Sequence, residues 1–429
     1  MLSIARAGGG FATCLLAIAA FRATSTAAPA LPDTAAVLSG PLTLERALAL
    51  AGQYELRIRA AGLRADAARA RIADAGRRPN PTVSASEENF GGQLGGGHRE
   101  ATLAIGQAFE LGGDRGARTA TAEAEYRLAA ADAGILGRDK LAEVAKRFIA
   151  AWSLQSRLER LRDGEALTEQ AVRAATERFQ AGASPRLEIL RAQSRATTQA
   201  VERQRVGSEL AIARQDLALS WGAVTVSFDS LVSPEQVLPH DDTGSPSRLQ
   251  THPDLTRAMA IEALAAARVQ SATAGRVPDL TVSGGVRRLE GLPGTRFLVG
   301  VELLLPLWNS GNGGLTAARR EVEATVAERR ETEQRLRVAL AAATERLRAA
   351  TAAYDTLRLH VLPAREQIVE ALLQGYRSGR SSYLDLVAEQ GGILETELAL
   401  IDAQADLWRA QVRPDVLAGT GLFTPKEAR

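Results

Sequence analysis

The sequence contains RRPNPTVS at residues 77–84 and, about 200 residues later, RVPDLTVS at residues 276–283. Two further matches keep the same order and nearly the same spacing. FQAGAS at residues 179–184 matches YRSGRS at residues 376–381. Between these blocks, four apolar residues also correspond, namely Leu103, Ile105, Phe109 and Leu111 with Val299, Val301, Leu305 and Leu307. Self-similarity at one long spacing indicates an internally duplicated fold.

Each repeat is predicted to contain a helix, two strands, a long helix, a turn and a final helix. Apolar residues alternate with small or polar ones in four segments, residues 82–88, 101–111, 280–288 and 296–307. This period of two is typical of strands with one apolar face. The connecting segments 89–99 and 289–294 are polar and glycine-rich, as hairpin loops are. A first helix is predicted from Thr43 to Gly76, ahead of Pro79.

The helices of the second half of each repeat are predicted to be long. Residues 115–180 contain no proline, and a helix of that length spans about 100 Å at ~1.5 Å per residue. Heptad spacing supports coiled-coil packing in the last two helices. Its positions are Leu336, Leu340, Ala343, Leu347, Ala350, Tyr354, Leu357 and Val361, then Leu394, Leu398, Ile401, Ala405, Trp408 and Val412.

The N-terminus has the features of a secretory signal peptide. Arg6 precedes an apolar run from Phe11 to Phe21, and small residues follow. We therefore expect a signal peptide at 1–30, a first repeat at 31–222, a linker at 223–250, a second repeat at 251–413 and a tail at 414–429. The linker is expected to lie against the helices midway along the molecule.

Composition argues against several functions. Lys and Arg total 52 against 50 Asp and Glu, a formal net charge of +2, which does not favour nucleic acid as a partner. The four histidines are scattered without ligand spacing, and the one cysteine, Cys14, falls in the expected signal peptide. No catalytic triad or carboxylate pair is evident. We expect no catalytic residue, no cofactor and no metal-ligating site.

Four strands per chain are too few to close a barrel, and an open sheet edge is not tolerated in lipid. Two chains would supply eight strands, a barrel filled by its own side chains. Three chains would supply twelve and keep an aqueous lumen. If the strands enter a membrane, the prediction is a closed trimer with long helices extending below it. The alternative is a secreted coiled-coil scaffold without a pore.

The chain resembles the TolC-type outer-membrane efflux proteins over nearly its whole length. RPNP at 78–81, ENFGG at 88–92 and QAFELGGDR at 107–115 resemble the heavy-metal cation efflux branch in particular. The resemblance implies an α+β membrane channel of the Gram-negative outer membrane. It implies a homotrimer with a twelve-stranded transmembrane β-barrel continuous with a periplasmic α-helical barrel. It also implies a periplasmic adaptor and, through it, an inner-membrane, proton-driven RND-type pump.

The repeated FQAGAS and YRSGRS blocks are expected at the tips of two helical hairpins. Gly182 and Gly379 would end long helices, and Ser184 and Ser381 would cap the helices that follow. By resemblance, the adaptor docks at these tips; the alternative is that the turns only reverse the chain.

Asp385 lies just past the second tip, where relatives carry acidic residues that line the periplasmic entrance. Three chains would place three carboxylates around the axis, which favours cations. Ala388 stands where some relatives have a second acid, and Glu389 is expected to face elsewhere. A solvated carboxylate at a helix start is the alternative for Asp385.

The sequence thus predicts an outer-membrane exit duct, exporting divalent heavy-metal cations of the Co, Zn, Cd and Ni class. A duct for drugs or other small solutes is the alternative within the same class.

Overall fold

The computed structural model describes residues 40–89, 99–182, 184–234, 249–378 and 380–412. The expected signal peptide, the C-terminal tail, Gly379 and part of the linker lie outside these residues.

The order of helices and strands confirms the internal duplication. The first repeat opens with a short helix, α1 (Leu44–Tyr54). It continues with α2 (Leu56–Ala75), β1 (Thr82–Glu88), β2 (Glu100–Phe109), α3 (Asp114–Gln180) and α4 (Arg186–Leu219). The second contains α6 (Pro253–Ala274), β3 (Leu280–Leu289), β4 (Thr295–Leu303), α7 (Asn312–Thr356), the π-helix η2 (Leu357–Val361), α8 (Leu362–Arg377) and α9 (Tyr383–Gln411).

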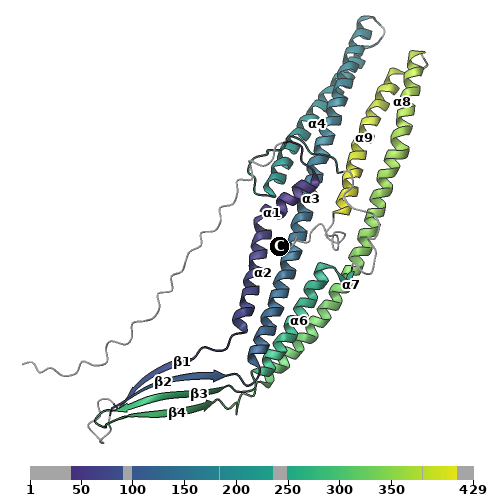
Figure 1. Cartoon of the computed structure of the whole chain (residues 1–429). Coiled ribbons are helices and arrows are strands. Elements are labelled where there is room, and N and C mark those ends of the chain that lie inside the picture. Colours follow the sequence, from purple (N-terminus) through teal and green to yellow (C-terminus); the bar gives the residue numbers. More distant parts are fainter. Residues whose placement is uncertain (1–39, 90–98, 183, 235–248, 379, 413–429) are drawn as a thin grey trace, which may run out of the picture.

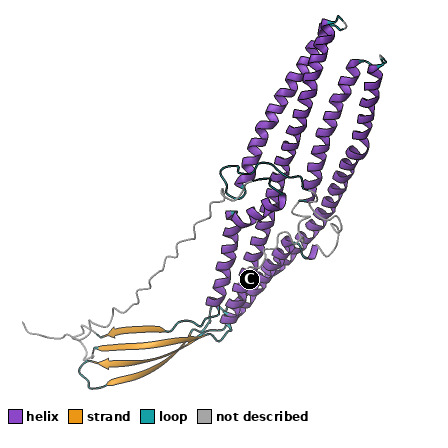
Figure 2. Cartoon of the chain, turned by 45° about the horizontal axis from the view of Figure 1, so that its top comes forward, coloured by secondary structure: helices purple, strands orange, loops and turns teal. Residues whose placement is uncertain are grey.

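The molecule is elongated, with the sheet at one end and the tips of two helical hairpins, α3–α4 and α8–α9, at the other (Figure 1). Helix α3 runs from the sheet to its tip. Its 67 residues span about 100 Å at ~1.5 Å per residue, as the proline-free segment predicted. Turning the molecule leaves the same arrangement visible, with strands projecting beyond the lower helices (Figure 2).

The four strands form one antiparallel sheet in the order β1-β2-β3-β4. Within the first hairpin Val83 lies opposite Ile105, and within the second Val282 lies opposite Val301. Strands β2 and β3 join the two hairpins, with Gly106 opposite Ser283. In this order β1 and β4 are the two edges of the sheet.

The main hydrophobic core lies in the middle of the molecule, where α1, α3 and the end of α9 meet. Trp152 on α3 contacts Trp408 on α9 edge to face, with ring centroids 4.4 Å apart. Residues 223–234 of the linker pack here as well. Phe228 and Leu231 are buried, and the Gln155 side chain hydrogen-bonds to both the carbonyl (3.1 Å) and the amide (3.0 Å) of Leu231.

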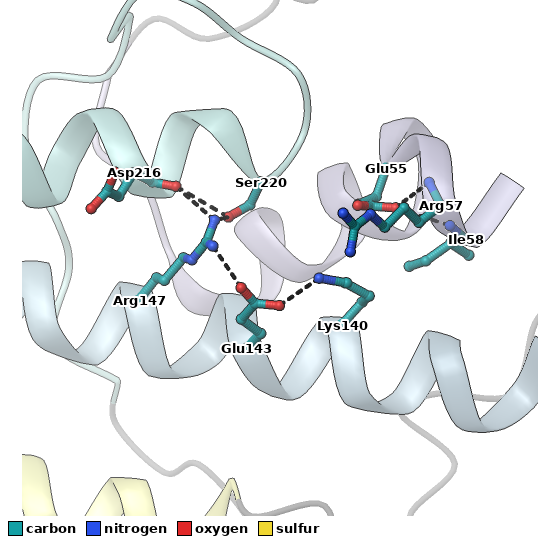
Figure 3. Close-up of polar contacts among 8 residues, drawn as sticks. All are labelled: Glu55, Arg57, Ile58, Lys140, Glu143, Arg147, Asp216 and Ser220. Atoms are coloured by element: carbon teal, nitrogen blue, oxygen red, sulfur yellow. Dashed lines mark hydrogen bonds and ion pairs between the residues drawn. The ribbon is translucent and has the colours of Figure 1, made fainter. Parts of the chain in front are cut away.

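A polar network beside this core ties α3 to the end of α4 (Figure 3). Glu143 accepts hydrogen bonds from Lys140 (2.7 Å) and Arg147 (2.6 Å). The hydrogen bond from Lys140, with support from the Arg147 charge, lowers the pKa of Glu143. Arg147 also donates to the Asp216 carbonyl and the Ser220 hydroxyl, both at 3.1 Å, and so satisfies acceptors in the last turn of α4.

The prediction of one continuous helix from Thr43 to Gly76 is wrong. Glu55 adopts an extended conformation between α1 and α2, with φ −67° and ψ 116°. Its carboxylate accepts hydrogen bonds from the amides of Arg57 (2.5 Å) and Ile58 (2.9 Å), so it caps α2 (Figure 3). The break turns α1 onto the core while α2 continues towards the sheet (Figure 1).

Other boundaries also differ from expectation. Strands β2 and β4 end at Phe109 and Leu303 instead of Leu111 and Leu307, because both residues lie opposite Leu280, where their common neighbour β3 begins. The heptad predicted through Val361 passes into the π-helix η2, directly before Pro363. A proline ring crowds the carbonyl four residues earlier and leaves it without a donor, which a widened turn accommodates.

Candidate functional site: the two-faced sheet and the hairpin tips

One face of the sheet is apolar and exposed. Cross-strand partners share a face, so the register places Val83, Ile105 and Val299 in one row and Leu103, Val286 and Phe297 in the next. Val299 is 81% exposed and Phe297 is 88% exposed. Further exposed members of this face are Phe109, Val282, Val301 and Leu303. An apolar surface of this extent, uncovered in the single chain, marks a site of contact with lipid or protein.

The opposite face of the sheet is polar or small apart from Leu289 and Leu298. It carries Thr82, Ser84, Ser86 and Glu88 from β1, and Ser283, Gly285 and Arg287 from β3. Arg287 donates to Glu100 (2.9 Å) and to the Thr102 hydroxyl (3.1 Å) across the β2–β3 junction. Sequence analysis did not single out these charged residues, although the same period of two that identified the strands assigns them to the polar face.

The first hairpin tip is a tight turn between α3 and α4. Gly182 has a left-handed backbone, with φ +72°, which favours glycine over residues with a Cβ atom. Pro185, and not Ser184, occupies the N-cap position of α4, without a side-chain capping bond. The prediction that Ser184 caps this helix is therefore wrong, because the helix begins one residue later than expected.

The second tip joins α8 to α9. The amides of Arg380 (2.7 Å) and Ser381 (3.2 Å) both donate to the carbonyl of Gly375. A Cβ atom on Gly375 would collide with the Ser381 side chain, so the turn closes tightly at this point. Helix α9 begins at Tyr383, so Ser382 and not Ser381 immediately precedes it. The cap expected from Ser381 stays a prediction. Gly379 is outside the described residues.

Asp385 lies in the first turn of α9 and is exposed. Ala388, Gly391 and Glu395 are also exposed further along the helix, whereas Glu389 pairs with Arg365 of α8 at 2.9 Å. Glu389 is therefore held within the α8–α9 hairpin by Arg365, although its spacing of four residues places it on the same side of the helix as Asp385. Sequence analysis missed Glu395, which could have been found by following the exposed side of the helix.

Carboxylates gather where the helices meet the sheet. Arg118 on α3 hydrogen-bonds to Glu110 and to the Arg77 carbonyl (3.1 Å). Asp279, which precedes β3, has a raised pKa because of partial burial and of repulsion from Asp114 and Glu110, opposed by Arg118. The three carboxylates Glu110, Asp114 and Asp279 thus all interact with Arg118 at this junction, and they raise its pKa.

Within the described ranges, no group of three or more His, Cys, Asp or Glu side chains is placed to hold a metal ion. None of the helices that the structure describes is long and apolar enough to cross a membrane.

A two-faced sheet joined to long paired helices, of which α3 spans about 100 Å, is the architecture of the class of outer-membrane channel subunits. The chain belongs to the outer membrane efflux protein family, whose model matches residues 47–223 and 245–420. The family consists of channel and transport proteins. The resemblance and the outer-membrane location expected from the sequence are confirmed.

Individual relatives agree with the family assignment. The chain is 27% identical over 401 residues to the cobalt-zinc-cadmium resistance protein CzcC of Cupriavidus metallidurans, covering 91% of this chain and 92% of that protein. The fold is similar to the outer membrane protein VceC of Vibrio cholerae, with a TM-score of 0.71, 19% identity and coverage of 87% of this chain and 95% of that one. It is also similar to CusC, with a TM-score of 0.74, 15% identity and coverage of 87% and 91%.

Proposed function

We propose that this protein is the outer-membrane exit duct of a tripartite efflux system for divalent heavy-metal cations. The observation that carries the proposal is the exposed apolar face of the sheet, backed by a polar face and flanked by two strand edges. Lipid covers the apolar face, and the polar face lines a water-filled lumen.

The duct is a trimer. A four-stranded sheet leaves unpaired backbone groups along β1 and β4, and such groups are costly in hydrocarbon. Three copies close a twelve-stranded transmembrane barrel and remove every edge, while two copies give a barrel too narrow for a channel. The helices of the three copies continue the barrel as a tube through the periplasm.

The cargo is a metal cation of the cobalt, zinc, cadmium and nickel class. Support comes from the similarity to a cobalt-zinc-cadmium resistance protein over 91% of the chain and from the sequence blocks around the first hairpin. The exposed Asp385 of each copy places a carboxylate at the periplasmic entrance, and a ring of three carboxylates favours cations over anions.

The hairpin tips are the docking site for a periplasmic adaptor, which links the duct to an inner-membrane RND-type pump. The tips carry Gly182 and Ser184 on one hairpin, and Gly379 and Ser381 on the other. The left-handed Gly182 and the close contact of Gly375 with Ser381 keep both turns small, so another protein can approach the backbone.

Metal sensitivity of a strain lacking the gene tests this function. We expect growth inhibition at lower Zn²⁺, Co²⁺, Cd²⁺ or Ni²⁺ concentrations, restored by the intact gene and not by a Gly182→Asp variant that fails to co-purify the adaptor. Detergent-stable trimers of that variant would show that it folds. Sensitivity to organic toxicants but not metals would assign the duct to another solute class. Normal growth with all of them would contradict the proposal.

A further inference from the structure

The two β-hairpins are equivalent not only in sequence but in strand register. The sequence repeat matches Val83 of β1 with Val282 of β3, and Ile105 of β2 with Val301 of β4. In the structure Val83 lies opposite Ile105, and Val282 lies opposite Val301. The same residue equivalence therefore describes both the sequence and the backbone pairing.

This equivalence predicts how the free edges pair. The join between hairpins inside the chain brings β2 against β3, with Gly106 opposite Ser283 and Thr102 opposite Arg287. The edge strand β4 is equivalent to β2, and the other edge strand β1 is equivalent to β3. An edge-to-edge contact between two copies of the chain would thus repeat the β2–β3 join.

We propose that β4 of one copy pairs antiparallel with β1 of the next in one defined register, with Glu302 opposite Ser84, Gly300 opposite Ser86 and Leu298 opposite Glu88. The occupant of each edge is a second copy of this chain. This inference rests on the proposed trimeric duct and specifies the pairing that closes it.

The charges on the polar face support this register independently. Inside the chain, like charges lie directly opposite each other at two places, Glu88 with Glu100 and Arg287 with Arg296. Such pairs destabilise a sheet unless opposite charges lie beside them. Arg287 and Glu100 form an ion pair of 2.9 Å across the β2–β3 join, but Glu88 and Arg296 have no ion-pair partner in the part of the chain that the structure describes.

The proposed register supplies those partners. Glu88 is the equivalent of Arg287, and Arg296 is the equivalent of Glu100. The contact between copies therefore contains an ion pair equivalent to that of the internal join, between Arg296 of one copy and Glu88 of the next. The acid and the arginine have exchanged strands. Around three copies the ring alternates two acids and two arginines, and every charge has one opposite neighbour.

Disulfide crosslinking tests the register, and the internal join provides the matched control. A Cβ atom on Gly106 would lie 3.8 Å from that of Ser283, which suits a disulfide. In a chain whose Cys14 is replaced by alanine, oxidation of Gly106→Cys with Ser283→Cys should link strands within one chain. The equivalent pair, Ser84→Cys with Glu302→Cys, should instead give covalent dimers and trimers on a non-reducing gel.

A slipped register is distinguished by Ser84→Cys with Gly300→Cys, since a slip of two residues keeps the same face. We expect this pair to crosslink at least tenfold more slowly. If it crosslinks faster than the first pair in intact trimers, the register is wrong while the duct stands. If the protein forms no trimer in detergent, the proposed function itself fails.

Charge exchange gives a second readout. Glu88→Arg should lower the temperature at which trimers dissociate, because it sets an arginine beside Arg296 of the neighbour. Adding Arg296→Glu should restore that temperature. The Glu88→Arg and Arg288→Glu combination makes the same change in net charge, keeps the Arg287–Glu100 pair and leaves Arg296 beside an arginine, so it should not restore the temperature. If both double variants had the same dissociation temperature, the proposed ion pair between Glu88 and Arg296 would be wrong.

Discussion

Asp279 carries a charge that its equivalent in the first repeat lacks. The first repeat has Asn80 at the equivalent position, after Pro79, whereas Asp279 follows Pro278. Partial burial and the charges of Asp114 and Glu110 raise the pKa of Asp279, so its ionised form is disfavoured in the folded chain. A raised pKa means that the group favours the folded state at low pH and that this contribution is lost as the pH rises through the folded pKa.

Asp279→Asn is therefore expected to raise the thermal unfolding temperature modestly at pH 7, and to change it little at a pH below the usual range of aspartate. The effect is small because Asp279 is largely exposed. Circular dichroism of the detergent-solubilised protein at both pH values measures it, with the exposed Asp66→Asn as a control. A fall in unfolding temperature at pH 7 would show that the carboxylate is stabilising.

Asp385 is the residue on which cation preference at the entrance depends. Asp385→Asn keeps the size of the side chain and removes three charges from the proposed trimer, so we expect the cation-to-anion permeability ratio to fall towards one. Reversal potentials in planar bilayers measure this ratio. Glu389→Gln is the comparison, because Glu389 pairs with Arg365 inside the hairpin. Equal loss in both variants would contradict a specific role for Asp385.

At the scale of the secondary-structure elements, the break between α1 and α2 decides how the chain enters the core. Glu55 stabilises the break, because its carboxylate accepts hydrogen bonds from two amides at the start of α2. Leu44, Ala47 and Leu50 of α1 are then buried.

Glu55→Ala is expected to destabilise the folded chain by about 1 kcal/mol, the usual cost of losing an N-cap. Glu55→Asp should recover part of this, because a shorter carboxylate still accepts at an N-cap. Chemical denaturation of the detergent-solubilised protein, followed by the fluorescence of the buried tryptophans, measures the change. A stability equal to that of the parent would mean that water replaces the cap without cost.

Much of the fold could be predicted from the sequence, because its strongest signals are periodic. The repeat, the alternation in four strands and the proline-free α3 all appear in the structure. The break at Glu55 could not be predicted, because the helical pattern of apolar residues continues across it. Many other carboxylates in the sequence could equally cap a helix, so Glu55 does not stand out. The π-helix before Pro363 could not be predicted for the same reason, because the heptad pattern continues through it.

The candidate site divides in the same way. The positions of Gly182 and Asp385 followed from local signals, a helix-breaking glycine and an acid in a first turn. The cap expected of Ser184 was wrong by one residue, because Pro185 occupies the N-cap position of α4. The pairing of charges on the sheet requires the register between strands far apart in sequence, such as Glu100 with Arg287, and no local pattern contains it.

At the scale of the whole molecule, the proposed duct makes the chain one third of a closed structure. Its helices bury a core in the middle, but its sheet exposes an apolar face and ends in two edge strands. Burial of that face in lipid favours insertion by about 25 cal/mol per Å² of apolar surface. Pairing of the two edge strands favours association between copies. In the proposed duct, insertion of the sheet and pairing of its edges in the outer membrane together close the barrel.

The mass of the mature protein extracted from outer membranes tests this claim most directly. We expect that salt does not release it, that mild detergent does, and that light scattering of the detergent complex gives three chains per particle. Heating should convert these particles to single chains on a gel. A protein that washes off with salt and remains a water-soluble single chain when offered lipid would contradict the account.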